Sequence, residues 1–208
     1  MDTATTLVSI AAVWGLAVVT PGPNFIVTLR SATAFSRWHG LAAAAGITTG
    51  TAIWGLAGFF GISTLFAVAP WLYAAFKVFG GLYLVYLGAR LIYASLRSRP
   101  QAIAAALPGR PTQCAIWRLG LATNLSNPKT AAFVTSLFAT TLPAEPSVTL
   151  GLMAAAAMAA ISIAWYASVA WIFSAPAMTG VYGRIAHLID RVAGGIFVAF
   201  GAKLALDR

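Results

Sequence analysis

Long apolar runs separated by short polar links make up most of the chain. A helix that spans a membrane needs about 20 mainly apolar residues, and the sequence contains six runs of roughly this length. The runs cover residues 4–29, 41–65, 71–92, 116–138, 149–173 and 187–206, of which the last is the shortest. The pattern therefore predicts an all-α membrane protein with six transmembrane helices. A sixth run that fails to span the membrane is the rival topology.

The first run is interrupted by the segment Thr20-Pro21-Gly22-Pro23-Asn24. Each proline lacks a backbone N–H and clashes with the preceding turn, so two prolines around a glycine should break the helix. In a bilayer, the backbone groups that a break leaves unpaired are tolerated only where protein or a water-filled cavity receives them. The break serves either packing alone or a site. Because discontinuous helices typically line transport sites, we expect a site.

The first and fourth helices share a motif. Residues 15–17 and residues 120–122 both read Gly-Leu-Ala. The first triplet precedes Pro23 and the second precedes Pro128, at the same spacing. The segment Asn127-Pro128-Lys129 therefore predicts a second break, in the fourth helix.

The third and sixth runs also match, with Lys77 and Arg191 at equivalent positions ahead of a Gly-Gly pair. Three helices per half is an odd number, so the second half must enter the membrane inverted relative to the first. The predicted architecture is an inverted 3+3 repeat with helices one and four interrupted, which is typical of secondary transporters. The predicted units are residues 1–94, the first repeat; 95–115, a basic cytoplasmic linker; and 116–208, the second, inverted repeat.

Positive charge marks one side of the predicted membrane protein. The links after the first, third and fifth helices contain arginines, whereas the link after the second has no charge and the link after the fourth carries only Glu145. The positive-inside rule then places the first, third and fifth links in the cytoplasm and both termini outside. Lys203 and Arg208 near the C-terminus argue mildly against this orientation.

Composition excludes several classes of protein. Of 208 residues, 60% are hydrophobic and 8% are charged, whereas a soluble domain carries roughly 25% charged residues. The net charge of +9 does not indicate nucleic-acid binding, because the 13 Lys and Arg residues are spread between the apolar runs. The single cysteine, Cys114, excludes an internal disulfide and a cysteine metal cluster. No nucleophile with a base, phosphate loop or metal-ligand cluster stands out, so we expect no enzyme, no cofactor and no metal site.

The two breaks suit a zwitterionic ligand. An interrupted helix presents unpaired N–H groups and the positive end of a dipole, which favour a carboxylate. The carbonyl groups on the other side of a break favour an ammonium group or a cation. We therefore expect an amino acid to bind around both breaks. The candidate substrate-binding residues are Pro21, Gly22, Pro23, Asn24, Lys77, Asn124, Asn127, Pro128 and Lys129.

Several other polar residues have two interpretations each. By their four-residue spacing, Thr20, Asn24 and Thr28 should share one helix face. The two threonines either help to select the substrate or hydrogen-bond the backbone groups at the break. Lys77 and Arg191 either meet the substrate carboxylate or gate the pathway, or they extend to the nearer membrane surface.

Aromatic and small residues also have two interpretations. Tyr83, Tyr86, Trp165 and Tyr166 either line the cavity or only pack. The spacing of Gly46, Gly50, Gly58 and Gly61 favours close packing of the second helix, within the fold or in a homodimer.

Taken together, these motifs resemble the LysE/RhtB family of bacterial amino-acid exporters, the LysE-type translocators. The resemblance covers nearly the whole chain and rests on residues 20–24, Gly46 to Gly50, Lys77 with Gly80 and residues 83–88, and Arg118-Leu119-Gly120 leading to Asn124 and residues 127–129. It implies a secondary transporter of the bacterial inner membrane that exports amino acids, or close derivatives such as homoserine lactone. It also implies that the proton-motive force drives export.

One departure from the family pattern bears on the substrate. Many relatives carry an aspartate after the glycine of the second helix, where this chain has Thr51. We therefore expect a neutral amino acid rather than lysine or arginine. The candidate gating or coupling residues are Thr51, Arg191 and Asp190. Asp190 is the acid best placed for proton coupling, and His39, His187 or the substrate itself are the alternatives.

Two other functions are alternatives to amino-acid export. An inorganic-ion transporter of the wider superfamily would need carboxylates, thiols or histidines at membrane depth. A non-transporting membrane interaction protein would have no cavity, and it would leave the repeated helix breaks unexplained.

Overall fold

The structure is a computed structural model that describes residues 3–68, 71–96, 111–143, 145–174, 187–188, 191–192, 194–199 and 201–202. Within these residues the chain is helical apart from short turns, and no strand occurs. The helices are α1 (Thr3–Val19), α2 (Pro23–Ala34), α3 (Arg37–Val68), α4 (Trp71–Leu96), α5 (Gln113–Leu125), α6 (Pro128–Thr141) and α7 (Val148–Ile172). Residues 191–192, 194–199 and 201–202 are also helical and fall in the sixth predicted run.

The predicted all-α fold is confirmed for the described part of the chain. The first predicted helix consists of α1 and α2, and the fourth consists of α5 and α6, so both predicted interruptions are present. Residues 97–110 of the predicted linker lie outside the described residues.

Length and apolar composition identify α7 and the Arg37–Gly61 part of α3 as helices able to cross a membrane. Helices α1 and α2 meet the same criteria together, as one pair bent by 56°. These spans were found among the described residues. The complete six-span inverted repeat stays a prediction.

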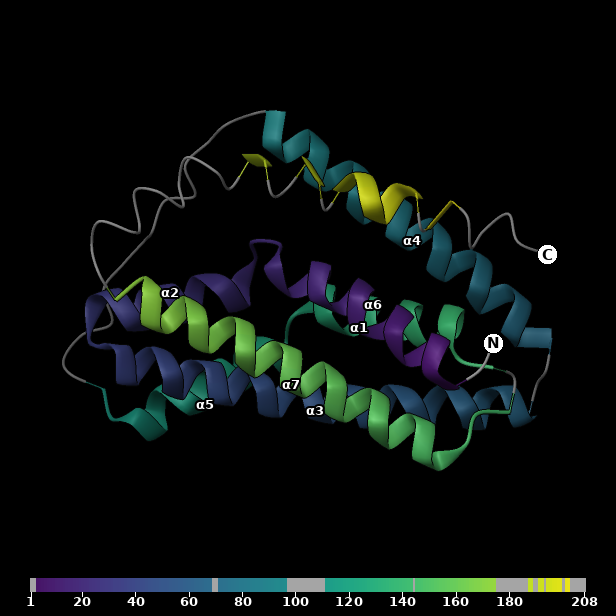
Figure 1. The fold of residues 1–208 in the computed structure, drawn as a ribbon, viewed down its shortest axis with the longest axis horizontal. Coiled ribbons are helices and arrows are strands. Elements are labelled where there is room, and N and C mark those ends of the chain that lie inside the picture. Colours follow the sequence, from purple (N-terminus) through teal and green to yellow (C-terminus); the bar gives the residue numbers. More distant parts are fainter. Residues whose placement is uncertain are drawn as a thin grey trace.

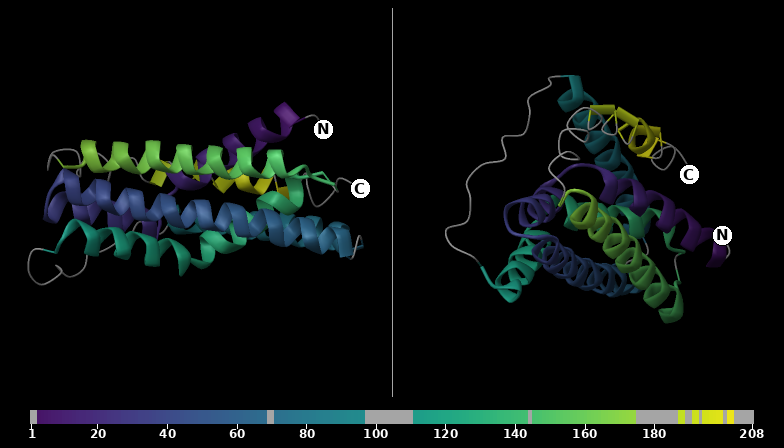
Figure 2. Two further views of the ribbon diagram at one scale, coloured as in Figure 1. Left: turned by 90° about the horizontal axis from the view of Figure 1, so that it is seen from below. Right: turned by 60° about the vertical axis from the view of Figure 1, so that its left-hand side comes forward.

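The helices run roughly along the long axis of a bundle, and α3 lies along its lower side in Figure 1. It lies between α5 and α7 (Figure 2, left), and it also contacts α2 and α6. Helix α4 packs on α6 and lies at one edge of the bundle beside the helical residues near the C-terminus. The two broken helix pairs thus share α3 as a neighbour.

The break between α1 and α2 follows directly from its sequence. Helix α1 ends at Val19, and the Thr20 N–H donates to the Leu16 carbonyl at 3.3 Å as the last turn closes. Gly22 then adopts an extended backbone as the N-cap of α2, with Pro23 in the first turn. Proline is favoured there because this position needs no N–H partner. Thr20 therefore precedes the break and does not share a helix face with Asn24, which corrects that expectation.

The break between α5 and α6 has a side-chain cap. Helix α5 closes with the Ser126 N–H donating to the Ala122 carbonyl at 2.9 Å. Asn127 is the N-cap of α6, and its Oδ1 accepts the Lys129 N–H at 3.0 Å. Asparagine is among the strongest N-caps, and Pro128 suits the first turn. The same local rules therefore produce both breaks.

Glycines allow α3 and α5 to touch through their backbones. A Cβ on Gly46 would overlap the carbonyl oxygen of Trp117, and a Cβ on Gly120 would overlap the carbonyl oxygen of Ala43. Small residues at such crossings let membrane helices approach closely. Gly61, by contrast, has nothing described within 4 Å of its Cβ position. Close packing through Gly46 is thus internal to the fold.

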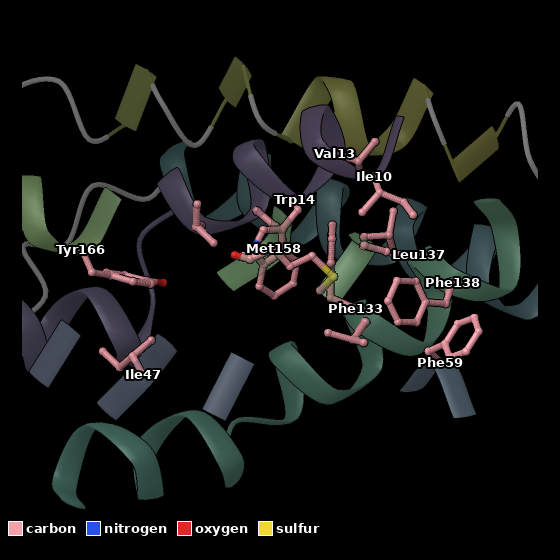
Figure 3. Close-up of a cluster of buried hydrophobic side chains, with 14 of the residues drawn as sticks. Ile10, Val13, Trp14, Ile47, Phe59, Phe133, Leu137, Phe138, Met158 and Tyr166 are labelled. Carbon is pink, nitrogen blue, oxygen red and sulfur yellow. Dashed lines mark hydrogen bonds between the residues drawn. The ribbon is translucent and has the colours of Figure 1, made fainter. Parts of the chain in front are cut away.

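A buried hydrophobic cluster joins α1, α3, α6 and α7 around the first break (Figure 3). Trp14 of α1 anchors this cluster, because its Nε1–H donates to the Met158 carbonyl and to the Ser162 hydroxyl, both at 3.0 Å. Its ring also packs against Phe133 of α6, with centroids 5.9 Å apart. The end of α1 is therefore held by two other helices.

We predict that Gly46→Ala and Gly61→Ala have opposite effects on stability. The Gly46 methyl must push α5 away, and such overpacking costs about 1–3 kcal/mol. The Gly61 methyl meets no atom of the described residues within 4 Å, and alanine improves helix propensity by up to about 1 kcal/mol. Thermal unfolding in detergent, followed by circular dichroism, should show a lower Tm for Gly46→Ala and an unchanged or higher Tm for Gly61→Ala. Equal Tm values would contradict the close backbone contact.

Candidate functional site

The two helix breaks border one cavity of about 30 Å³. Its wall is built from the end of α1, the start of α2, the middle of α3, the start of α6 and one residue of α7. The lining residues are Trp14, Ala17, Val18, Thr20, Gly22, Asn24, Phe25, Thr51, Asn127, Lys129, Thr130, Phe133 and Tyr166. The predicted meeting of the two breaks at a common cavity is therefore present in the structure.

The size of the cavity limits what it holds in this conformation. A water molecule needs about 10–15 Å³ of such volume, so 30 Å³ accommodates about two waters. An amino acid is larger, and it can enter only after the surrounding helices move apart. The structure thus represents a conformation that is closed to an amino acid.

The end of α1 supplies a negative pole to the cavity. The last carbonyls of a helix have no partner within it and carry the negative end of its dipole. The carbonyl oxygen of Ala17 is one of them, and it accepts a hydrogen bond from the Nζ of Lys129 at 3.4 Å. The lysine thereby connects the second break to the first.

The start of α2 supplies the opposite pole. Its N-cap is Gly22, which has no side chain with which to cap the first N–H groups. Asn24 and Phe25, in this first turn, both line the cavity. The first N–H groups of a helix carry the positive end of its dipole and readily bind an anion. The two poles of one broken helix therefore border the same cavity.

Asn24 adds a polar side chain between these poles. It is 8% exposed, and its side chain lies next to the side chain of Tyr166 from α7. In Figure 3 the Tyr166 hydroxyl points toward the side on which Trp14 and Phe133 lie. The Oδ1 atom of Asn24 is buried and has no hydrogen-bond partner among the described residues. A buried acceptor without a partner is costly, so this oxygen is suited to a ligand donor.

Asn124 and Thr51 lie together behind this wall. The Asn124 Nδ2 donates to the Thr51 hydroxyl at 3.4 Å, and the Trp54 Nε1 donates to the Asn124 carbonyl at 3.3 Å. Asn124 is fully buried against Gly50 and is not among the lining residues, whereas Thr51 is. Asn124 therefore stands one layer behind the cavity and supports Thr51.

The remaining predicted site residues lie elsewhere. Pro21 and the exposed Pro23 shape the break without lining the cavity. Arg191 is exposed, and its Nε donates to the Ser95 hydroxyl at 3.3 Å. Lys77 lies in α4 and Pro128 begins α6, but their side chains are outside the described part of the structure, as is the whole of Asp190. The gating and coupling roles of Asp190 and Arg191 stay predictions.

Several lining residues have no signal in the sequence. Trp14, Phe25, Thr130 and Phe133 lie in ordinary apolar helix, and only the folded arrangement brings them to the cavity. Thr20 also lines it, while its hydroxyl donates to the Leu16 carbonyl at 2.9 Å.

Acidic groups are scarce near this site. Among the described residues, Glu145 is the only carboxylate side chain, and it is exposed between α6 and α7. The same residues contain no group of three or more His, Cys, Asp or Glu side chains that could hold a metal ion.

Comparison with known proteins identifies the family. The family model of the LysE type translocators matches residues 16–208. The uncharacterized membrane protein YahN of Escherichia coli K12 is 33% identical, over 93% of this chain and 87% of its own length. The threonine efflux protein of the same bacterium is 30% identical, over 96% of this chain and 97% of its own.

A leucine efflux protein of Klebsiella pneumoniae is also 30% identical, over 90% of this chain and 89% of its own length. No solved structure matches the chain. The family match covers nearly all of the sequence, and the relatives align over most of their length. The resemblance inferred from the helix breaks is thus confirmed, and this membrane protein belongs to the LysE type translocator family.

Proposed function

We propose that this protein is a secondary transporter that exports a neutral amino acid from the cytoplasm. The observation that carries the proposal is the cavity between the two oppositely charged ends of one broken helix. Relatives named as threonine and leucine efflux proteins support an amino acid as the substrate class. The proposed location is the bacterial inner membrane.

The poles of the break suit the two charges of an amino acid. The substrate carboxylate binds the N–H groups at the start of α2, close to Gly22. The substrate ammonium binds the Ala17 carbonyl at the end of α1 and the unpartnered Oδ1 of Asn24. Discontinuous helices bind anionic groups and cations in this way in other transporters. The α-amino and α-carboxyl groups thus fix the orientation of the ligand, and the side chain faces Trp14 and Phe133.

The charge of the lining favours a neutral side chain on the substrate. Among the described lining residues, Lys129 is the one with a formal charge, and none is a carboxylate. A lysine or arginine substrate would therefore find no counter-charge for its side chain. The apolar walls around Trp14, Phe133 and Phe25 accept a small or aliphatic side chain.

Transport follows from opening the closed cavity to one side at a time. In the proposed six-span inverted repeat, the two halves exchange conformations, and the cavity at the breaks is exposed in turn to the cytoplasm and to the outside. The first, third and fifth links face the cytoplasm in this arrangement, as the charge distribution favours. The proton-motive force drives the cycle.

We predict that the protein accelerates the efflux of neutral amino acids from cells. Cells with and without the protein are loaded by feeding dipeptides of threonine, leucine, serine, lysine and arginine, and the amino acids released are quantified by chromatography. We expect faster efflux of at least one neutral amino acid and no change for lysine or arginine. Unchanged efflux of every amino acid, with the protein shown to be in the membrane, would contradict the proposed function.

Replacing Asn24 tests the ammonium subsite. A hydrogen bond to a charged group contributes about 1.5–3 kcal/mol, so Asn24→Ala should raise the KM for the exported amino acid by about 10- to 100-fold. Thr28→Val is the matched control, because Thr28 is also buried, one turn further along α2. Its hydroxyl donates to the Asn24 carbonyl, and it does not line the cavity. Initial transport rates in proteoliposomes give the KM of each variant. Similar KM values for the two variants would rule out this subsite.

A further inference from the structure

We infer that the Lys129 ammonium is an internal substitute for the ammonium group of the substrate, and that its displacement couples amino-acid export to proton entry. The inference rests on the proposed function and deepens it, because it assigns the coupling to a cation at the substrate site rather than to a carboxylate. Its basis is the position of Lys129 Nζ at the same carbonyl pole that we assign to the substrate ammonium.

Lys129 reaches this pole from the opposite half of the chain. It lies in the first turn of α6, and its Nζ donates to the Ala17 carbonyl at the end of α1, at 3.4 Å. The Nζ lies 3.9 Å from where a Cβ of Gly22 would be, so it is next to the break itself. The lysine side chain thus fills part of the space between the poles, in a cavity that now admits about two waters.

Two ammonium groups cannot share one carbonyl pole. Like charges repel strongly at short distance in a site that water reaches poorly. When a substrate ammonium approaches the Ala17 carbonyl, Lys129 must either leave or lose its charge. Lysine changes its protonation readily when its surroundings change. Binding of the zwitterion therefore favours the neutral amine of Lys129.

The proton balance of a cycle follows. Substrate binding from the cytoplasm converts Lys129–NH3⁺ to Lys129–NH2, and the proton passes to cytoplasmic water. The loaded site opens outward and releases the zwitterion. The amine of Lys129 then takes a proton from outside water and returns to the Ala17 carbonyl, and the protein reopens inward. One proton enters and one zwitterion leaves, so each cycle moves one positive charge inward. Both the pH gradient and the membrane potential drive such export.

Few other groups could carry this proton. Among the described residues that line the cavity, Tyr166 of α7 is the one other ionisable side chain, and it lies next to Asn24. The lining residues contributed by α1, α2 and α3 contain no ionisable side chain in the described part of the chain. Lys129 is therefore the group whose charge a bound zwitterion changes.

The rival interpretation is that Lys129 stays charged and binds the substrate carboxylate. In that case the substrate strengthens the charged form, and binding releases no proton. The two interpretations differ in the sign of the proton change and in the effect of a permanent positive charge at position 129.

The first experiment uses the unaltered protein in detergent and weak buffer. L-threonine and L-leucine are added as probes, and proton release is measured with a pH dye alongside calorimetric binding. We expect about one proton released per amino acid bound, and weaker binding as the pH falls. Binding without proton release would overturn the inference and leave the proposed function intact. Absence of binding by both probes would overturn the proposed function and this inference with it.

The second experiment compares Lys129→Gln with Lys129→Arg in proteoliposomes. The neutral glutamine leaves the Ala17 carbonyl open, so threonine exchange at equal pH should persist while threonine-driven proton movement is lost. The arginine keeps its charge, stays at the carbonyl and should reduce exchange at least tenfold. The opposite pattern, with exchange kept by Lys129→Arg and lost in Lys129→Gln, would establish the carboxylate role instead.

A matched control and a check of folding complete the design. Arg118→Gln removes an exposed cation from α5 and should leave both exchange and proton movement unchanged. Gel filtration and thermal unfolding show whether each variant is folded. If Lys129→Gln does not fold, the proton release of the unaltered protein still decides between the two interpretations.

Discussion

The whole site depends on the requirement that backbone N–H and C=O groups inside a membrane be satisfied. Pro21 and Pro23 make an uninterrupted first helix impossible. The break leaves the last carbonyls of α1 and the first N–H groups of α2 without partners inside their own helices. The chain does not bury these groups in apolar packing. It surrounds them with Lys129 and with polar side chains such as Asn24 and Thr20, around a small cavity. The zwitterion that we propose as the ligand would complete both poles at once.

The rest of the bundle holds this cavity in place. Backbone contact at Gly46 and Gly120 brings α5, and with it the second break, close to α3. Trp14 ties the end of α1 to α7 through two hydrogen bonds. These contacts involve elements far apart in the sequence, so the site exists only in the folded chain.

The sequence predicted those features that local rules decide. Proline and asparagine have strong positional preferences, so both breaks and the helices around them could be placed before the structure was known. The residues of the cavity wall could not be predicted in this way. Nothing in the sequence distinguishes Phe133 from any other buried aromatic residue, and only the packing of α6 against α1 brings it to Trp14. The four-residue spacing misplaced Thr20 on the face of Asn24, because the break predicted between them ends one helix before Thr20 and begins another at Pro23. The contact of Lys129 with Ala17 joins distant segments, which no local pattern reveals.

The most direct test of the central claim is a cryo-electron microscopy structure of the protein with L-threonine bound. We expect density for the amino acid between the end of α1 and the start of α2, with its ammonium at the Ala17 carbonyl, its carboxylate at the N–H groups after Gly22, and Lys129 displaced. Density at a site remote from both breaks, or an amino acid bound in the reverse orientation with its carboxylate on Lys129, would contradict this mechanism.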